Sequence, residues 1–502
     1  MAETLILRAD ASTRMGTGHV MRCLALAQAW QDAGGRAVFA SAECPAPLAE
    51  RLRGEGAEVA RLEAEPGGEK DASATALLAD REGARWVVAD GYQFGGEYQS
   101  ALKGTGLRLL FVDDAGHAGH YSADLVLNQN VYADAGFYAA REPRTRLLLG
   151  TRYALLRREF RLWAERRRDV PEVARRLLLT MGGGDASNVT LKALRGIELA
   201  ESEPLSVTVL VGGGNPHHGE LVAFAARSRH RVELKTGGTD VPELMAEADV
   251  ALTGGGTTCL ELALMGLPFI IFVLADNQAP GAVRLAEQQA AVNLGSHERV
   301  TPEQVAEAFG RLSKDASARA EMSRRGRSLV DGLGAERVVR EIRRGGLKLR
   351  RAVEADGRLL WEWANEPGAR AVSFSPESIA WETHAGWFNS KLNDPRCFLF
   401  VAENDEGEPV GQVRFDIDSS EAVISVSVDA RSRGGGVGGE LIRLGSRALF
   451  DAAPVALIHA YVKPDNRASV RAFEGAGYRR AGSVEVRGHE ALDLVLQKGD
   501  GD

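Results

Sequence analysis

Residues 254–268 read GGGTTCLELALMGLP, and they constrain the fold more than any other stretch of this chain. An apolar run at 249–253 precedes them and another occupies 268–273, which predicts two buried parallel strands with a helix between them. Three consecutive glycines let a ligand come close to the backbone. The new helix would point unpaired N–H groups and its positive end at that ligand.

The side chains around these glycines favour a nucleotide. A diphosphate fits the helix start, where Gly255 and Gly256 open the backbone and the hydroxyls of Thr257 and Thr258 add donors. Glu261 lies one turn further along, where a carboxylate can accept hydrogen bonds from two ribose hydroxyls. A tight turn with a capping threonine and a surface glutamate is the alternative, but the Thr-Thr-x-x-Glu pattern and the second strand favour the nucleotide.

Composition excludes several classes of partner. The 502 residues suffice for two to four domains, and a net charge of -8 provides no basic field for nucleic acid. The four cysteines form no C-x-x-C pair, which suits a reducing compartment and argues against a zinc ribbon. We find no secretory leader and no apolar run of the roughly 20 residues that cross a membrane, so we expect a cytoplasmic protein without a membrane partner.

Alternating strand and helix patterns predict two parallel sheets. Strands of the first are expected at 5–9, 36–40, 86–90, 109–114 and 125–128, and the second begins with strands at 176–181 and 206–211. Ligands bind at the carboxyl ends of such strands. We therefore expect an α/β fold, a GT-B-like pair of Rossmann-type domains at 1–160 and 161–345 that face each other across a cleft.

Composition changes after Gly345-Gly346, which we expect to be a hinge. Helices at 302–344 would close the second domain, and a return of the chain to the first domain is left open. Tryptophan is frequent beyond this point and alternating strands are expected at 397–403 and 411–416, which predicts a third, α+β domain at 347–498.

A histidine follows the first strand, in the loop Gly16-Thr17-Gly18-His19. Histidine transfers protons near neutral pH, and a helix N-terminus disfavours the imidazolium form, which keeps the ring available as a base. A histidine that only caps the helix is the alternative. The backbone freedom of Gly16 and Gly18, together with a nucleotide cleft nearby, favours a catalytic role for His19.

Charged and aromatic residues around this loop are candidates for supporting roles. Asp10 is expected to orient the histidine, and Arg14 or Arg22 to offset diphosphate charge, with a structural ion pair as the alternative for each. Asp90 and Tyr92 fall at the end of the strand at 86–90, where the sugar would lie. Functional and structural roles are equally open for both of them.

The opening stretch at 8–27, which contains RADAS and GTGHVMRCLALA, is supported by shorter stretches at 112–114, 127–130, 182–190, 254–268 and 276–278. Together they resemble the UDP-sugar hydrolases of pseudaminic acid biosynthesis, which release UDP from UDP-2,4-diacetamido-2,4,6-trideoxy-β-L-altropyranose. The resemblance covers about residues 1–345. It implies a GT-B-type fold, His19 as the catalytic base and a metal-independent reaction in which water attacks the anomeric carbon and UDP leaves.

The resemblance also implies a substrate site. Residues that would contact UDP or the sugar are Gly183, Thr257, Thr258, Glu261, Asn277 and Gln278. The histidines at 117, 120, 217 and 218 lack a cysteine or clustered carboxylates to complete a ligand set, so we expect exposed loop histidines and no metal.

The third domain carries a second kind of glycine-rich junction. A strand at 422–429 is followed by Arg433-Gly434-Gly435-Gly436-Val437-Gly438 and a helix, and the N–H groups of this loop would cradle the pyrophosphate of a coenzyme. A glycine-rich linker is the alternative, but it does not account for the helix or for the stretch at 460–478. These paired motifs resemble the GNAT acetyltransferases over about residues 347–498.

That resemblance implies acetyl-CoA as the donor, held between two splayed strands by Val428, Arg433, Gly434, Gly436, Val437, Gly438 and Asn466. Many members place a tyrosine acid seven residues after the asparagine, where this chain has Phe473, so Tyr461, Tyr478 or a water would serve instead. The tryptophans at 361, 363, 381 and 387 would build the acceptor pocket or belong to the core.

Consecutive reactions would explain why the two halves share a chain. In the pseudaminic acid pathway an acetyltransferase acts on UDP-4-amino-4,6-dideoxy-β-L-AltNAc just before the hydrolase. We expect this chain to acetylate that amino sugar and then to release UDP. The alternatives are a UDP-sugar glycosyltransferase, a non-hydrolytic UDP-sugar binding module that serves the acetyltransferase, and acetylation of a protein N-terminus. No pattern in the sequence specifies an oligomeric state.

Overall fold

The computed structural model describes residues 2–12, 15–236, 240–343, 347–404, 407–433 and 436–499. The chain divides into two compact units, residues 1–342 and 343–502. Arg14, Gly434 and the expected hinge at Gly345-Gly346 lie outside the described residues.

The first sheet is entirely parallel, with strands in the order β3-β2-β1-β4-β5-β6-β7. Its strands are β1 (Thr4–Ala9), β2 (Arg36–Ser41), β3 (Glu58–Arg61), β4 (Trp86–Asp90), β5 (Arg108–Val112), β6 (Leu125–Asn128) and β7 (Arg146–Leu149). The chain reverses its direction of travel across the sheet between β1 and β4. In parallel sheets this reversal leaves a crevice at the carboxyl ends of the two strands, where ligands bind.

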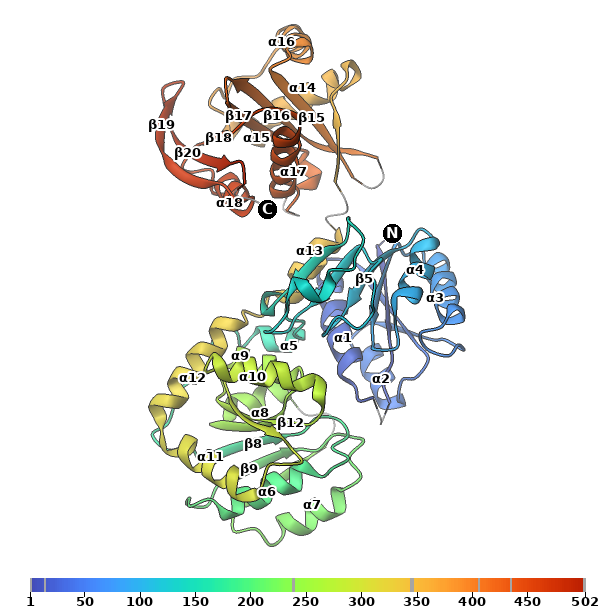
Figure 1. The fold of residues 1–502 in the computed structure, drawn as a ribbon, viewed down its shortest axis with the longest axis vertical. Helices are drawn as coiled ribbons and strands as arrows, with labels where there is room; N and C mark the ends of the chain where they lie inside the picture. Colours follow the sequence, from blue (N-terminus) through green and yellow to red (C-terminus); the bar gives the residue numbers. More distant parts are fainter. Residues whose placement is uncertain are drawn as a thin grey trace. The chain divides into compact units, whose positions relative to one another are not determined.

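Helices cover both faces of this sheet (Figure 1). They are α1 (Gly18–Asp32), α2 (Ala46–Gly54), α3 (Glu69–Arg81) and α4 (Gly96–Gly104). Successive residues of β1 point to opposite faces, so Leu5 and Leu7 join the core under α1 while Ile6 joins the core under α3 and α4. Burial on both faces explains why the strands are continuous apolar runs.

A connector leads from the first sheet to the second. It contains the short 3-10 helices at Ala135–Tyr138 and Thr151–Tyr153 and the single helical turn α5 (Arg158–Arg161). Phe160 on this turn is fully buried in a core that belongs to the second sheet. The connector is therefore packed into the structure and holds its side chains in defined places.

The second sheet is also parallel, in the order β10-β9-β8-β11-β12-β13. Its strands are β8 (Arg176–Thr180), β9 (Ser206–Leu210), β10 (Arg231–Lys235), β11 (Val250–Gly254), β12 (Phe269–Val273) and β13 (Val292–Ser296). Its helices are α6 (Val189–Leu199), α7 (His218–Ala225), α8 (Val241–Glu247), α9 (Thr258–Met265), α10 (Ala279–Glu287), α11 (Pro302–Lys314) and α12 (Ala316–Leu329), with a 3-10 turn at Asp276–Gln278. The chain reverses direction here between β8 and β11, so the glycine-rich stretch follows a strand at the reversal point.

The last helix of this unit, α13 (Gly334–Arg343), returns to the first sheet. Its apolar residues Val338, Val339 and Ile342 are buried in the same core as Leu5 and Leu7, and Glu341 pairs with Arg146 of β7 at 2.7 Å. The return that the sequence left open is thus present. It ties the two sheets together at a second point besides the connector.

The second unit contains a mixed sheet in the order β14-β15-β16-β17-β18-β20-β19. Its strands are β14 (Lys348–Arg351), β15 (Cys397–Glu403), β16 (Pro409–Asp418), β17 (Glu421–Val428), β18 (Leu457–Val462), β19 (Arg479–Val486) and β20 (His489–Gln497). Its helices are α14 (Gly357–Asn365), α15 (Pro367–Val372), α16 (Trp381–Asn393), α17 (Val437–Ala452) and α18 (Arg467–Gly475), with 3-10 turns at Glu354–Asp356 and Ala430–Ser432. The expected fold class, two parallel α/β sheets followed by an α+β domain, is confirmed.

Candidate functional site

His19 lies where β1 passes into α1. The loop before the helix is closed by a hydrogen bond from the Gly16 N–H to the Ser12 carbonyl at 2.8 Å, and Gly16 has a φ of +81° that only glycine adopts freely. The helix begins at Gly18, so His19 is its second residue. This geometry brings the imidazole to the carboxyl end of the sheet, beside the end of β4.

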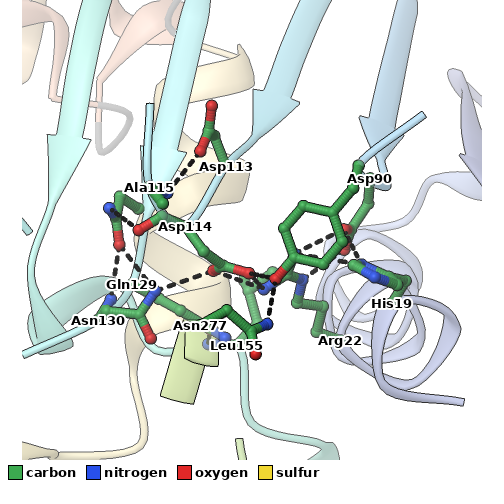
Figure 2. Close-up of polar contacts among 12 residues, drawn as sticks. His19, Arg22, Asp90, Asp113, Asp114, Ala115, Gln129, Asn130, Leu155 and Asn277 are labelled. Atoms are coloured by element: carbon green, nitrogen blue, oxygen red, sulfur yellow. Dashed lines mark hydrogen bonds and ion pairs between the residues drawn. The ribbon is translucent and has the colours of Figure 1, made fainter. Parts of the chain in front are cut away.

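The ring of His19 is paired with Asp90, the last residue of β4 (Figure 2). His19 Nδ1 lies 2.6 Å from Asp90 Oδ1, and the imidazole is 11% exposed. Because a carboxylate only accepts, this contact places the ring proton on Nδ1 and leaves the lone pair on Nε2. The described residues provide no recorded partner for Nε2. The ring can therefore take up a proton at that atom.

Arg22, one turn further along α1, holds the other side of Asp90. Its Nε donates to Oδ2 at 2.5 Å and its Nη2 to Oδ1 at 2.7 Å. Burial alone would raise the pKa of Asp90, but the charges and hydrogen bonds of Arg22 and His19 lower it to about 2. Asp90 is thus a permanent anion that orients His19.

Asp114, after β5, is the second anion of this network. It accepts hydrogen bonds from Arg22 Nη1 at 2.9 Å, from Asn130 Nδ2 at 2.8 Å and from the Tyr92 hydroxyl at 3.0 Å. Burial, followed by the charge of Asp114, raises the pKa of Tyr92 to about 12, so this hydroxyl keeps its proton. With three donors on one carboxylate, no proton on Asp114 is available for acid catalysis.

The same tyrosine joins the two sheets. Asn277, in the 3-10 turn after β12, donates from Nδ2 to the Tyr92 hydroxyl at 2.9 Å, and Figure 2 shows Asn277 directed toward the His19 network. The Tyr92 ring also meets the His19 ring edge-on, with centroids 5.2 Å apart. A residue predicted near the substrate on the second sheet therefore reaches the histidine site on the first.

The prediction that Asp10 orients His19 is wrong. The Asp10 carboxylate accepts from the N–H groups of Ala42 at 2.7 Å and Glu43 at 3.1 Å, and it pairs with Arg8 at 2.8 Å. Since β1 lies between β2 and β4, Asp10 turns toward the β2 side while the histidine turns toward the β4 side. Asp90 takes the role instead, and its position at a strand end was the signal that could have found it.

Arg22 is likewise placed by the structural alternative considered for it. Its guanidinium is occupied by Asp90 and Asp114 and is not directed at a phosphate. The candidate metal histidines also differ from expectation in one case, because His117 is half-buried and bonded to Asp113 at 3.2 Å. Within the described ranges, no group of three His, Cys, Asp or Glu side chains is arranged to bind a metal.

The glycine-rich junction on the second sheet presents backbone instead of charged side chains. Strand β11 ends at Gly254, and α9 begins at Thr258 with Thr257 at its cap. A Cβ added to Gly256 would meet nothing within 4 Å, so this position faces open space beside the first turn of α9. That is the arrangement a diphosphate requires.

Gln278 has a different role from the one predicted. Its Oε1 accepts from the N–H groups of Gly255 and Leu274, both at 3.0 Å, and so fastens the glycine loop to the strand beside it. A Cβ on Gly255 would lie 3.0 Å from Gln278 Cβ, which explains the glycine there. Gln278 shapes the loop, and this carboxamide oxygen is not free for the sugar or diphosphate.

Two further predicted residues lie where the two sheets approach each other. A Cβ on Gly183 would come 3.9 Å from Thr17 Oγ1, so the loop after β8 faces the loop that carries His19. Glu261, in the first turn of α9, is paired with Arg157 of the connector at 3.0 Å. Gly18 has open space around it, as Gly256 does.

In the second unit, β17 and β18 form a fork. They pair in parallel only at Glu421, Ala422 and Val423, and the remaining residues of β17 up to Val428 pair with β16 alone. The carbonyls and N–H groups on the inner side of the fork are thus left for another partner. A linear amide-containing chain is the ligand that this opening fits.

The junction after β17 lies at the mouth of the fork. Gly436 caps α17 with a φ of +82°, the helix begins at Val437, and a Cβ on Gly438 would lie 3.7 Å from the Val428 side chain. The N-terminus of α17 therefore points its free N–H groups beside the end of β17, as a pyrophosphate site requires.

Arg433 and Asn466 have other partners here. Arg433 Nη2 binds Glu366 Oε2 at 2.7 Å and its Nε donates to the Val428 carbonyl at 3.1 Å. Asn466 caps α18 by accepting from the Ser469 N–H at 3.2 Å. Both residues lie at the expected place in the sequence of elements, but their printed contacts are structural.

The structure separates the two tyrosines considered as replacements for the missing acid. Phe473 packs against Tyr478 in the core, with ring centroids 5.1 Å apart, and the Tyr478 hydroxyl is 2.9 Å from Ser446 Oγ. Tyr461 lies on the opposite face of β18, because Ala460 and Val462 beside it point into that core. Tyr461 is therefore the better placed of the two.

Comparisons with known proteins agree with these two modules. Residues 178–335 match the glycosyltransferase family 28 C-terminal domain, and residues 346–479 match an acetyltransferase (GNAT) domain. The chain therefore combines a GT-B-type nucleotide-sugar module with a GNAT module.

Two relatives are similar to the first module. The spore coat polysaccharide biosynthesis protein SpsG of Bacillus subtilis (strain 168) is 27% identical over 46% of this chain and 67% of its own length. The UDP-2,4-diacetamido-2,4,6-trideoxy-β-L-altropyranose hydrolase of Campylobacter jejuni subsp. jejuni serotype O:2 is 26% identical over 57% of this chain and 96% of its own length.

The second module is similar to a solved structure of aminoglycoside acetyltransferase AAC(6')-Ib in complex with coenzyme A. That match has 22% identity and a TM-score of 0.29, and it covers 31% of this chain and 96% of the other. As for membranes, the described helices include none with the length and apolar character of a spanning segment.

Proposed function

We propose that this chain is a bifunctional enzyme of pseudaminic acid biosynthesis that acts in the cytoplasm. The GNAT module transfers an acetyl group from acetyl-CoA to the 4-amino group of UDP-4-amino-4,6-dideoxy-β-L-AltNAc. The GT-B-type module then hydrolyses the resulting UDP-2,4-diacetamido-2,4,6-trideoxy-β-L-altropyranose to the free sugar and UDP. The four cysteines, none of them in a disulfide, suit a reducing compartment.

The observation that carries the hydrolase proposal is the combination of one base with no acid. His19 offers Nε2 as a proton acceptor, while the neighbouring carboxylates Asp90 and Asp114 are saturated with donors and stay ionised. Hydrolysis of an ordinary glycoside needs a protonated carboxylic acid for the leaving group. A nucleoside diphosphate leaves without one, so this site suits a sugar nucleotide in which water is activated by His19.

The glycine junction of α9 supplies what the leaving group requires. Its free first-turn N–H groups and the Thr257 and Thr258 hydroxyls stabilise the charge that develops on the diphosphate when the anomeric C–O bond breaks. Asn277 and Tyr92 lie between this loop and His19, where the sugar ring would bind. Relatives named as a spore coat polysaccharide protein and as the hydrolase itself support a sugar nucleotide.

The fork between β17 and β18 supports acetyl-CoA as co-substrate. A pantetheine arm carries two amides that can pair with the unpaired edge of β17 while its pyrophosphate binds at the start of α17. The amine attacks the thioester carbonyl, the C–S bond breaks, and the coenzyme thiolate takes a proton. We propose Tyr461 as the donor of that proton.

The test is a single incubation with the amino sugar nucleotide and acetyl-CoA, followed by NMR of the products. We expect coenzyme A, UDP and the free diacetamido sugar. An acetylated sugar that keeps its UDP would contradict the hydrolase half, and a free amino sugar without an acetyl group would contradict the order of the two steps. A Tyr461→Phe variant should acetylate about tenfold more slowly or worse, whereas Tyr478→Phe should keep its rate.

A glycosyltransferase is the second candidate, because residues 178–335 match a glycosyltransferase family 28 domain. Such an enzyme would pass the sugar to an acceptor and would release UDP slowly in its absence. Release of UDP with multiple turnovers and no acceptor would exclude it. Acetylation of a peptide N-terminus but not of the amino sugar would redirect the second module to a protein substrate.

A further inference from the structure

A buried ion pair joins the connector to the glycine junction of the second sheet. Arg157 Nη2 donates to Glu261 Oε1 at 3.0 Å, and the two side chains are 8% and 15% exposed. Arg157 comes directly before α5, and Glu261 lies in the first turn of α9. None of the site residues considered so far explains why an arginine is placed there.

The guanidinium of Arg157 is held in place by its surroundings. It lies 5.1 Å above the centre of the Phe160 ring, and its Nη1 pairs with Glu159 Oε1 at 2.7 Å. Phe160 is itself fully buried, so the arginine is anchored to a rigid element. It presents a fixed donor to Glu261.

This contact uses one oxygen of the Glu261 carboxylate. Within the described part of the chain, Oε2 has no recorded partner, and one lone pair of Oε1 also remains. Glu261 is therefore an oriented acceptor with unused capacity, one helical turn from the backbone groups proposed to hold the diphosphate. Two adjacent hydroxyls are the ligand groups that match it.

The charge of the pair also matters. Burial raises the pKa of Glu261 above its ordinary value, and Arg157 opposes this rise. The other charged groups that act on this carboxyl are Glu159, which raises its pKa, and Arg51, which lowers it. Without Arg157, a carboxylate near two phosphates would repel them or become protonated, and either change removes its use as an acceptor.

We propose that Arg157 is a positioning residue that makes this site select ribonucleotides. It holds Glu261 ionised and turned so that the free carboxylate lone pairs accept from the 2′- and 3′-hydroxyls of the nucleotide. This inference rests on the proposed nucleotide site. It goes beyond that site by assigning sugar discrimination to an ion pair between the connector and α9.

Calorimetric titration with UDP and with 2′,3′-dideoxy-UDP tests the proposal. Hydrogen bonds to a charged acceptor contribute enough to make the wild type prefer UDP by about 10- to 100-fold. Arg157→Met should reduce that preference to about threefold or less, with little change in the affinity for dideoxy-UDP. Arg157→Lys, which keeps the charge on a shorter contact, should retain part of it.

A matched control and a double variant separate positioning from folding. Arg51→Ala removes an exposed arginine that binds Glu159 but not Glu261, and it should keep the full preference. A lone buried carboxylate can destabilise Arg157→Met, so the double variant Arg157→Met with Glu261→Gln removes both charges. It should bind both nucleotides as Glu261→Gln alone does, because Arg157 acts through that residue.

Full preference for UDP in Arg157→Met, or in Glu261→Gln, would overturn the inference. So would a wild type that binds UDP and dideoxy-UDP equally well, and in that case the proposed function would stand. A wild type that binds neither UDP nor the UDP-sugar would overturn the proposed nucleotide site itself.

Discussion

The first unit contains two strand-to-helix junctions that look alike in sequence and work by different physical means. Each follows a strand at the reversal point of its sheet, passes through glycines and enters a helix. The β1–α1 junction gathers charged side chains from several strands around His19. The β11–α9 junction presents backbone N–H groups, small hydroxyls and one carboxylate.

This difference suggests a division of labour. Side-chain charges at the first junction fix the proton position on His19, which bears on the rate of the chemical step. Backbone donors at the second junction bind a phosphate in the ground state and the transition state alike, which bears mainly on affinity. Variants of the two junctions should therefore separate kcat from nucleotide affinity.

The largest effect should come from the histidine itself. His19→Asn keeps a side chain that can contact Asp90 but cannot take up a proton, so kcat for UDP release should fall by about 10²- to 10⁴-fold. The affinity for UDP, measured by calorimetry, should stay within about threefold because the α9 junction is unchanged. His120→Asn, at an exposed histidine paired with Glu142, is the control and should keep its rate. Unchanged turnover in His19→Asn would favour a binding module.

The next effect distinguishes the residue found by the structure from the one predicted by sequence. Asp90→Asn cannot hold the Nδ1 proton as an anion does and leaves Arg22 with one buried partner, so we expect kcat to fall by about 100-fold and stability to decrease by about 3 kcal/mol. Asp10→Asn should destabilise the protein through Arg8 while retaining most of kcat. Both are measured by UDP release and by denaturant unfolding. A larger loss of kcat in Asp10→Asn would reverse our assignment.

At the second junction, neighbouring glycines should respond in opposite ways. Gly256→Ala adds a methyl group into open space where the diphosphate would bind, so affinity for UDP should fall by about tenfold with an unchanged melting temperature. Gly255→Ala forces a methyl group against Gln278 and should reduce stability by about 1–3 kcal/mol. If Gly256→Ala binds UDP normally, the ligand does not lie over this glycine.

The two junctions also differ in how far sequence alone could describe them. At α9 the functional groups are contiguous, so strand, glycines and helix start were all predicted within a few residues of their places. At α1 the helix and His19 were predicted, but Asp90 lies 71 residues away and Asp114 lies further still. Which strand end faces the histidine depends on strand order, and local patterns do not encode that order. Gln278 was misassigned for the same reason, since its partner Gly255 lies on a neighbouring loop.

The smallest expected effect concerns acid stability, and it follows from the charges at the first junction. The pKa of Asp90 is about 2 in the folded protein, whereas an unfolded aspartate titrates near about 3.9. Its stabilising contribution is thus complete above about pH 4 and is lost as the pH falls through 2. Denaturant unfolding at several pH values should show a loss of stability in this interval that is smaller in Asp90→Asn than in the wild type. Equal slopes would mean that Asp90 is not held as an anion, and His19 would then lack the partner that fixes its reactive nitrogen.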